Sequence, residues 1–250
     1  TLAASYVGGG FFVMGISAYH ILKKQYTNIF LKSFRIGLIF ALVSSLFVVV
    51  EGHMHGSDLA DKQPAKLAAL ESLWVTQKNA PVYLITLPDP KNNGNIIEIG
   101  AVPGAMSLLA YHTTDAVVTG LNDIPKEDRP PVLATFISFK IMVTLGMLFA
   151  LLTVIGWFLR KRIESYPIYL RIMFYAVPLP YIACAFGWTV TEVGRQPWIV
   201  YGLMGTSQAA SPVAMSQVAV SLAAFIVVYT LIGFIAFMLM AQAVRKGPEA

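Results

Sequence analysis

The chain has 250 residues, of which 56% are hydrophobic and only 12% are charged, and its formal net charge is +5. A soluble domain carries about 25% charged residues, so this composition excludes an ordinary soluble protein and indicates an integral membrane protein. The basic residues lie in short runs beside apolar segments and form no single patch, which argues against a nucleic-acid partner. Cys184 is the only cysteine and lies inside an apolar segment, which excludes disulfides and cysteine-based metal sites.

Two apolar segments open the chain. Residues 2–22 are long enough to cross a bilayer as a helix, which takes about 20 residues. Three consecutive glycines beginning at Gly8 favour close packing of another helix, and they would also admit a planar ligand. The second apolar core, 36–50, is too short on its own, so we expect a span over about 29–50 whose two basic residues reach back to the interface.

A polar insertion over residues 51–131 follows the second span. It holds ten acidic residues, six basic residues and eight prolines. We expect a short amphipathic helix over 65–76 and mainly loop elsewhere. So long a segment between two spans is usually functional and not a simple linker.

Three further spans are expected, over residues 132–159, 172–190 and 218–240. Pro178 and Pro180 interrupt the fourth span and predict a kink, because proline removes a helical hydrogen bond and clashes with the preceding turn. The sequence therefore predicts an all-α integral membrane protein. We expect about five transmembrane helices and an outward-facing loop domain of roughly 80 residues, which together form one membrane domain.

The distribution of basic residues predicts how the spans are oriented. The segments 23–35 and 160–171 and the C-terminus together hold ten lysines and arginines and two acidic residues. Cytoplasmic loops are enriched in lysine and arginine, so these segments are expected in the cytoplasm. The start of the chain, the insertion and the polar loop over 191–217 are then expected on the outer side.

Lys140 and Met142 lie within the third span. A lysine inside a bilayer costs about 2.5–3.5 kcal/mol on insertion scales, so Lys140 should face an anion or a water-filled cavity, unless it reaches to the outer surface instead. The Met142 thioether is a suitable axial ligand for a low-spin haem iron. In a chain with ten methionines, however, a single one more commonly serves only for packing.

The segment 187–198 places a carboxylate at the end of the fourth span. Trp188 and Glu192 are four residues apart and face the same way on a helix. Glu192 could ligate a haem or another metal or handle protons, or it could simply be solvated or paired with Arg195. Arg195 is one of few positive charges expected outside, which suggests a fixed anionic partner such as a haem propionate, whereas Trp198 suits an interfacial anchor.

The insertion carries a further pair of candidates. Lys66 and Glu71 lie five residues apart on the expected short helix. They could bind a polar head group and accept its proton. The alternative is that both belong to the solvated face of a surface helix.

The four histidines predict no metal site. His53 and His55, with Glu51 nearby, would suit a metal only in extended geometry, so a solvated outer loop is preferred. His20 ends the first span and is expected at the membrane interface, and His112 lies in the insertion without an identifiable partner. The sequence contains no glycine-rich phosphate loop, nucleophile elbow or zinc signature.

Several motifs along the chain become specific when they are taken together. They are the first-span segments 4–7 and 12–19, the insertion segment Gln63-Pro64-Ala65-Lys66-Leu67-Ala68-Ala69-Leu70-Glu71, the segments 120–122 and 127–131, and the turn Gly194-Arg195-Gln196-Pro197-Trp198. In these motifs the chain resembles subunit I of the bacterial cytochrome bd quinol oxidases. The likeness runs nearly end to end, and the last motif is highly characteristic.

The resemblance implies roles for individual residues. The insertion corresponds to the short version of an outward-facing quinol-binding loop, in which Lys66 and Glu71 match residues implicated in quinol oxidation. Met142 matches an axial ligand of the low-spin haem b. Glu192 matches a carboxylate ligand of the high-spin haem b beside haem d, and Trp188 matches the tryptophan near that haem.

Two basic residues complete the set that the resemblance implies. Arg195 matches a motif arginine on the haem side. Lys140 stands where many relatives have an arginine, so the charge is kept but the bidentate geometry for a propionate is lost. The implied cofactors are two haems b and a haem d, or a third haem b, with quinol as the substrate.

Members of the family carry four further spans upstream, and among them the histidine opposite the methionine ligand. We therefore expect this chain to be the C-terminal part of the subunit, in a bacterial cell membrane. The expected partners are the N-terminal spans, subunit II, a small accessory subunit, membrane lipid, quinol and oxygen, and no nucleic acid.

The leading hypothesis is part of a terminal respiratory oxidase. Quinol would be oxidised at the outer membrane face, and electrons would pass through b-type haems to the site where oxygen is reduced to water. A transporter or channel with Lys140 and Glu192 on its substrate path is an alternative, but it predicts an internal pseudo-symmetry that the sequence lacks. In a third interpretation, a non-catalytic assembly subunit, the same residues only pack.

Overall fold

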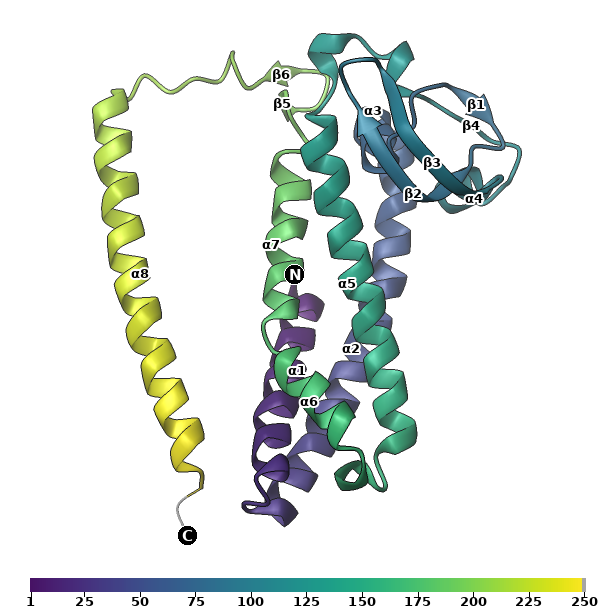
Figure 1. Ribbon diagram of the computed structural model, residues 1–250. Helices are drawn as coiled ribbons and strands as arrows, with labels where there is room; N and C mark the ends of the chain where they lie inside the picture. The colour runs from purple at the N-terminus through teal and green to yellow at the C-terminus, as the bar shows by residue number, and fades with distance from the viewer. Residues whose placement is uncertain (249–250) are drawn as a thin grey trace. The chain divides into compact units, whose positions relative to one another are not determined.

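The computed structural model describes residues 1–248 and divides the chain into two compact units, Thr1–Gln208 and Ala209–Ala250. Five of its helical segments are long and apolar enough to cross a membrane, which confirms the predicted class of fold. The first unit contains α1 (Leu2–Leu22), α2 (Thr27–Lys62), α5 (Val132–Leu159), α6 (Pro167–Tyr175) and α7 (Leu179–Glu192), and the second contains α8 (Met215–Lys246) (Figure 1).

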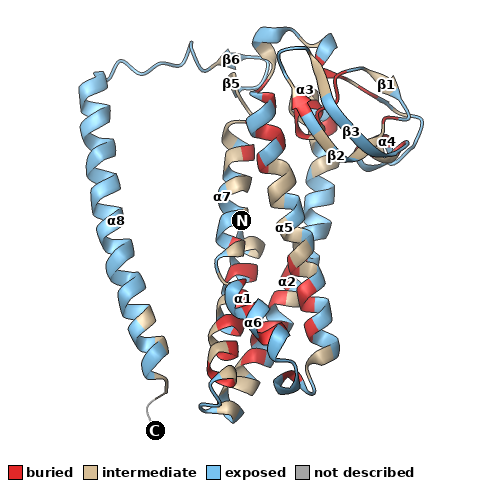
Figure 2. Cartoon of the chain, viewed as in Figure 1, coloured by how far each residue is buried: buried red, intermediate tan, exposed pale blue. Residues whose placement is uncertain are grey.

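A buried apolar core holds the helices of the first unit together. Phe11 and Met14 of α1, Phe34 and Leu38 of α2, and Met173 of α6 are completely buried. Figure 2 shows such buried residues on the facing sides of these helices. Burial of a large apolar side chain stabilises a fold by about 1.5–3 kcal/mol, so these contacts fix how the helices pack.

Small residues bring α1 and α2 into close contact. A Cβ atom added at Gly10 would lie 2.7 Å from the Cβ of Ala41, so no larger side chain fits there. Gly37 has the same constraint, because an added Cβ would lie 3.1 Å from a side-chain carbon of Val13. Gly10 therefore serves close helix packing, the first of the two uses that the sequence allows, whereas a Cβ atom added at Gly9 would have no atom within 4 Å.

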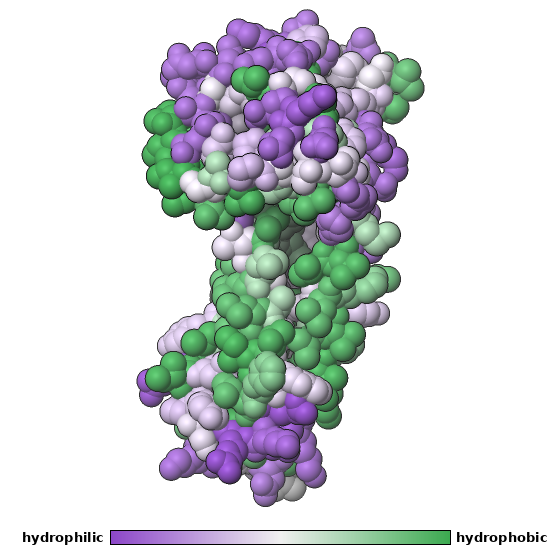
Figure 3. Space-filling view, turned by 90° about the vertical axis from the view of Figure 1, so that its right-hand side faces the viewer, coloured by the Kyte–Doolittle hydropathy of each residue, from purple (hydrophilic) through white to green (hydrophobic). Residues whose placement is uncertain are grey.

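The surface of the first unit suits a lipid environment. Figure 3 shows a hydrophobic band between two hydrophilic ends on the face that it presents. Large apolar side chains on the helix surfaces, such as Ile36 and Phe158, are exposed. Water would disfavour so much exposed apolar surface, whereas hydrocarbon chains cover it at no cost.

Helix α2 is longer than the sequence analysis predicts. The second span was expected to end near residue 50 and to lead into a loop, whereas α2 continues to Lys62. No proline interrupts the chain before Pro64, and two pairs of side chains four residues apart support the additional turns. Glu51 contacts His55 and Asp58 contacts Lys62, each at 3.3 Å.

The rest of the insertion contains short helices and small two-stranded sheets. The helices are α3 (Pro64–Glu71) and α4 (Ala105–Tyr111), so the first helix ends before the predicted residue 76. Antiparallel pairs join β2 (Val82–Asp89) to β3 (Gly94–Val102) and β1 (Gln77–Lys78) to β4 (Val117–Val118). The expectation of mainly loop is therefore wrong for this hairpin, which the turn over residues 90–93, with Asn93 in a left-handed conformation, and the apolar β-branched residues of both strands favour.

The fourth span is broken where its prolines lie. Helix α6 ends at Tyr175 and α7 begins at Leu179, with a turn between them. The predicted kink is therefore present as a complete interruption of the helix. After α7, β5 (Trp198–Val200) and β6 (Met204–Gly205) form a short hairpin in the segment predicted to be a polar loop.

Candidate functional site

Helix α3 places both candidate residues of the insertion against the membrane helices. It lies beside the N-terminal end of α5 (Figure 1). Pro64 begins the helix, a position where the missing N–H costs nothing, and Ser72 ends it in a left-handed conformation. Lys66 and Glu71 therefore project from the two ends of one short, rigid element.

Glu71 pairs with the lysine of the third span. The Nζ of Lys140 donates a hydrogen bond to Oε2 of Glu71 at 2.6 Å, and the two side chains are 31% and 16% exposed. The same ammonium lies 5.4 Å from the centre of the Phe136 ring. Of the surroundings that the sequence analysis allows for Lys140, the structure contains an anion, a carboxylate of the insertion, and the pair ties α3 to α5.

Lys66 lies beside the turn that follows α7. A Cβ atom added at the buried Gly194 would lie 3.1 Å from Cε of Lys66, so the glycine leaves the space that the lysine side chain uses. Burial lowers the pKa of Lys66, the Arg195 guanidinium lowers that pKa further, and the Glu192 carboxylate opposes the change. Two motifs more than 120 residues apart in sequence therefore share one electrostatic environment.

Glu192 and Arg195 form an ion pair that leaves polar atoms available. The Nη2 of Arg195 donates to Oε2 of Glu192 at 2.7 Å, while the side chains are 41% and 39% exposed. Within residues 1–248 the other carboxylate oxygen, Oε1, accepts no hydrogen bond. The Nε of Arg195 is buried and has no partner in that part of the chain. A buried donor without a partner is costly, so this atom indicates an acceptor that the chain itself does not supply.

Met142 lies on α5, half-buried, with its sulfur directed at α7. A Cβ atom added at Gly187 would lie 3.0 Å from Sδ of Met142. One residue further along α7, Trp188 is 69% exposed. The helix therefore has a small residue where it meets the sulfur and a large aromatic residue on its open surface.

These atoms fit the ligands and contacts that haem groups require. A thioether is a haem-iron ligand, and the unpaired Oε1 of Glu192 is a second candidate ligand. The buried Nε of Arg195 suits an anionic oxygen such as that of a propionate. Met142 and Glu192 are the residues that would hold iron, and Lys140 and Arg195 are the cations nearest to them in the sequence.

The histidines lie outside this arrangement. His53 is close to His112, with ring centroids 5.4 Å apart, and Ser57 Oγ lies 3.4 Å from Nε2 of His112. His20 lies in the last turn of α1, where it is buried and stacks on Phe30. Among the described residues there is no group of three or more histidine, cysteine, aspartate or glutamate side chains that could hold a metal.

Three residues near the site were not singled out by the sequence analysis, although Gln63 and Gly187 lie within segments that it quotes. Gly187 sets the space beside Met142, and Thr135 has a buried hydroxyl without a partner within residues 1–248. The same holds for the buried side-chain oxygen of Gln63, just before α3. Only the packing of α3, α5 and α7 brings these residues to the site, so no spacing rule could have identified them.

Comparison with known proteins gives a consistent result along the chain. The family model for cytochrome bd terminal oxidase subunit I matches residues 1–248. The chain is 37% identical to cytochrome bd ubiquinol oxidase subunit 1 of Bacillus subtilis over 96% of its length, and 28% identical to cytochrome bd-II ubiquinol oxidase subunit 1 of Escherichia coli over 100%. The structure of bd oxidase from Geobacillus thermodenitrificans superimposes with a TM-score of 0.86 at 31% identity, covering 99% of the chain.

The chain is shorter than these proteins. It spans 54% of the B. subtilis subunit, 62% of the E. coli subunit and 57% of the Geobacillus chain. The match nevertheless includes the insertion and every predicted span. The chain therefore belongs to the family of cytochrome bd terminal oxidase subunit I.

Proposed function

We propose that this chain supplies the quinol-oxidising side of a terminal respiratory oxidase. The observation that carries the proposal is the position of α3, because its two polar residues contact the two segments proposed to hold haem. Glu71 pairs with Lys140, two residues before Met142, and Lys66 lies beside the Glu192–Arg195 turn. A substrate bound at α3 is therefore next to the elements that would receive its electrons.

Glu71 and Lys66 have complementary roles in this proposal. The Glu71 carboxylate accepts a proton from the quinol hydroxyl, and Lys140 keeps it in place. The Lys66 ammonium donates a hydrogen bond to the second quinol oxygen, whose own proton passes to water at the outer face. Because loss of electrons makes the quinol protons acidic, a base and a donor at opposite ends of one helix suit this reaction.

The haem contacts of the chain follow from the fit of its donor atoms. Met142 would hold the iron of a low-spin haem b, and Glu192 would hold the iron of a high-spin haem b with Trp188 beside it. Arg195 and Lys140 would face propionates. Bound haem supplies one-electron carriers between quinol and a third haem, d or b, where oxygen is reduced to water.

The complete enzyme extends beyond this chain. The further spans of subunit I, a subunit II and a small accessory subunit are the proposed protein partners, in a bacterial cell membrane with bound lipid. The insertion and the start of the chain would lie outside and the C-terminus in the cytoplasm. Quinol protons would then leave outside while the protons for water come from inside, which separates charge across the membrane.

The proposal is tested by Glu71→Gln in the complete oxidase complex. Loss of a general base typically lowers a rate by about 100-fold, so haem reduction by quinol should slow by that order. Reoxidation of the pre-reduced enzyme by oxygen and the haem absorbance should stay as in the parent enzyme. Both are measured by stopped-flow spectroscopy.

The matched control is Glu127→Gln, which removes an exposed carboxylate elsewhere in the insertion. It should leave both half-reactions as they are. Normal haem reduction in Glu71→Gln would reject the proposed role of α3. Absence of haem absorbance from the complete parent complex would reject the oxidase function itself.

A further inference from the structure

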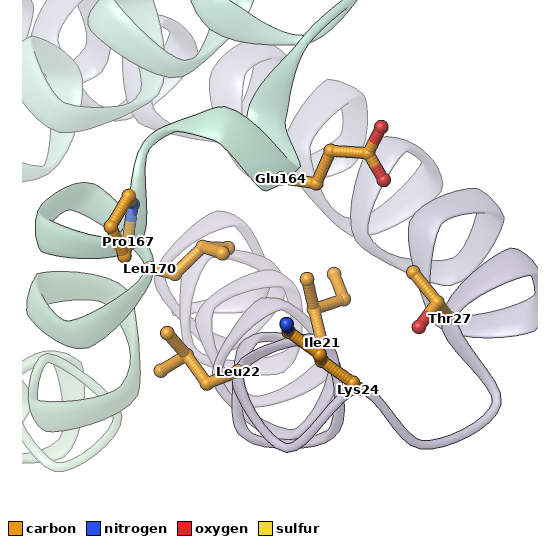
Figure 4. A pocket seen from close by; sticks show the side chains of 7 residues that line it. All are labelled: Ile21, Leu22, Lys24, Thr27, Glu164, Pro167 and Leu170. Atoms are coloured by element: carbon orange, nitrogen blue, oxygen red, sulfur yellow. The ribbon is translucent and has the colours of Figure 1, made fainter.

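The described chain contains a cavity at the end of the first unit opposite to α3. It has a volume of about 480 Å³ and lies among the end of α1, the start of α2 and the start of α6 (Figure 4). Its lining residues are Ile21, Leu22, Lys24, Thr27, Glu164, Pro167 and Leu170. No residue proposed for quinol or haem belongs to it, so a role for this cavity is independent of the proposed function.

The cavity wall combines apolar side chains with two opposite charges. Figure 4 shows Leu22, Pro167 and Leu170 on one side and Thr27 and Glu164 on the other, with the Lys24 side chain between them. Within residues 1–248, the side chains of Lys24 and Glu164 form no ion pair or hydrogen bond with each other or with any other residue. A cation and an anion that line one cavity but do not pair are both available to a ligand.

The surroundings of the cavity are strongly basic. The two loops at this end, 23–35 and 160–171, contain eight basic residues and Glu164 as the single acid. Lys23 is engaged elsewhere, because its Nζ donates to the Tyr19 hydroxyl at 2.6 Å and lies over the Tyr19 ring. Such a field attracts phosphate groups, and basic sites between membrane helices at this position suit lipid head groups.

Glu164 selects among such head groups. A purely anionic head group would bring its phosphate into the same cavity as the Glu164 carboxylate, which is unfavourable. A head group with a primary amine has a positive charge a few bonds from its phosphate. Its phosphate can meet Lys24 while its ammonium meets Glu164, and its acyl chains can follow the apolar wall.

We propose that this cavity binds an amine-bearing phospholipid, with Lys24 contacting the phosphate and Glu164 contacting the ammonium. The apolar side chains of the wall cover the first carbons of an acyl chain. Thr27 closes the side of the cavity next to Glu164. The lipid would fill the space between α1 and α6 and thereby fix the cytoplasmic-side ends of the first unit.

The test uses the complete oxidase complex, delipidated and titrated with dioleoyl phosphatidylethanolamine or dioleoyl phosphatidylglycerol, with bound lipid counted by native mass spectrometry. The parent complex should bind phosphatidylethanolamine more tightly. Lys24→Gln and Glu164→Gln should each weaken that binding by about fivefold, as expected for exposed charge contacts. Glu164→Gln should also abolish the preference over phosphatidylglycerol.

Two further variants separate the site from general charge effects. Lys23→Gln removes the same charge from the neighbouring residue outside the cavity and should change binding less than about twofold. Thr27→Phe fills the cavity without altering a charge and should also prevent tight binding, provided that the complex elutes at its normal size. Equal binding of the two lipids, or no effect of Lys24→Gln and Glu164→Gln, would overturn the proposal. The proposal would also be overturned if the parent complex preferred phosphatidylglycerol and Glu164→Gln bound that lipid still more tightly.

Discussion

Lys66 differs from an ordinary surface lysine because of its neighbours. Burial and the Arg195 guanidinium lower its pKa, while Glu192 acts in the opposite direction. Lys66 therefore loses its proton at a lower pH than an exposed lysine does. A reaction that needs the ammonium form is supported below that lowered pKa and fails as the pH rises through it.

We predict that Lys66→Arg moves the alkaline limb of quinol oxidation to higher pH. Arginine stays charged throughout the accessible range, so the donor is no longer lost, although its planar geometry will lower the maximal rate. Lys66→Gln should lower the rate at every pH. The measurement is the rate of haem reduction by quinol between about pH 6 and 10, a range that covers the ordinary pKa values of histidine and lysine. If the alkaline limb does not move in Lys66→Arg, the group that titrates in this limb is not Lys66.

The contact between Met142 and Gly187 gives a second prediction. Gly187→Ala places a methyl group within 3.0 Å of the Met142 sulfur, which must then move. Displacement of an axial ligand changes the low-spin haem b spectrum, so we expect a shifted or diminished b-type absorbance in the reduced-minus-oxidised spectrum. Met142→Leu should remove that signal and leave the other haems in place.

Gly146→Ala is the control for this prediction. Gly146 lies on α5, one turn beyond Met142, and an added Cβ there has no atom within 4 Å. Its spectrum should equal that of the parent enzyme. If Met142→Leu leaves the low-spin signal unchanged, Met142 is not a ligand, and the packing interpretation of this methionine is correct.

The sequence predicts the surroundings of some single residues but not their partners. The cost of burying a charge predicts an anion or a water-filled cavity for Lys140, and the structure contains the anion, but nothing in the spacing identifies Glu71, 69 residues away. For Glu192 the sequence leaves solvation, pairing and ligation open. The structure contains the pair with Arg195 and also a carboxylate oxygen without a partner among residues 1–248, so the pair does not exclude ligation.

At the level of elements, the β2–β3 hairpin is anchored to the end of α3. The Nδ2 of Asn95 donates to the Ser72 carbonyl at 3.0 Å, and its Oδ1 accepts from Trp74 Nε1 at 3.0 Å and from the Ser72 hydroxyl at 2.6 Å. Trp74 and Ser72 are buried, so these donors have no access to water as a replacement. The hairpin therefore supports the helix that carries Lys66 and Glu71.

We predict that Asn95→Ala loosens the insertion without affecting the membrane helices. Loss of one partner leaves buried polar groups unsatisfied, which costs about 1–3 kcal/mol. Limited proteolysis should cut the segment 76–104 faster, and the KM for quinol should rise. Asn92→Ala, in the exposed turn where Asn92 donates to Asp89, is the control and should be cut at the parent rate. If the protease cut Asn95→Ala no faster than the parent protein, the hairpin would not depend on this anchor.

Elements were predictable where one physical signal dominates. Long apolar runs identify the spans, and Pro178 and Pro180 correctly locate the break between α6 and α7. The end of α2 was placed 12 residues too early, since hydropathy ends at residue 50 while helical hydrogen bonding continues to Lys62. Polarity marks the edge of the membrane and not the edge of the helix, so the two boundaries need not coincide.

At the scale of the whole molecule, the charges of the connecting segments and the position of the sites depend on each other. The basic loops lie at one end of the first unit, and α3 with its two candidate residues lies at the other. The charge bias then predicts that the proposed quinol site lies outside and that the proposed lipid site lies in the cytoplasmic leaflet. If the orientation were reversed, quinol protons would be released inside and the proposed reaction would separate charge in the opposite direction.

Cysteine accessibility tests this orientation directly. The chain has one cysteine, Cys184, which is exposed on α7 within the fourth span, so a Cys184→Ser background removes it. Glu98→Cys then reports on the β2–β3 hairpin, and Lys161→Cys reports on the loop before α6. In intact cells a membrane-impermeant maleimide should label Glu98→Cys and not Lys161→Cys, and permeabilisation should make both reactive. Labelling of Lys161→Cys alone in intact cells would invert the topology, and the assignment of the quinol site to the outer face would be wrong.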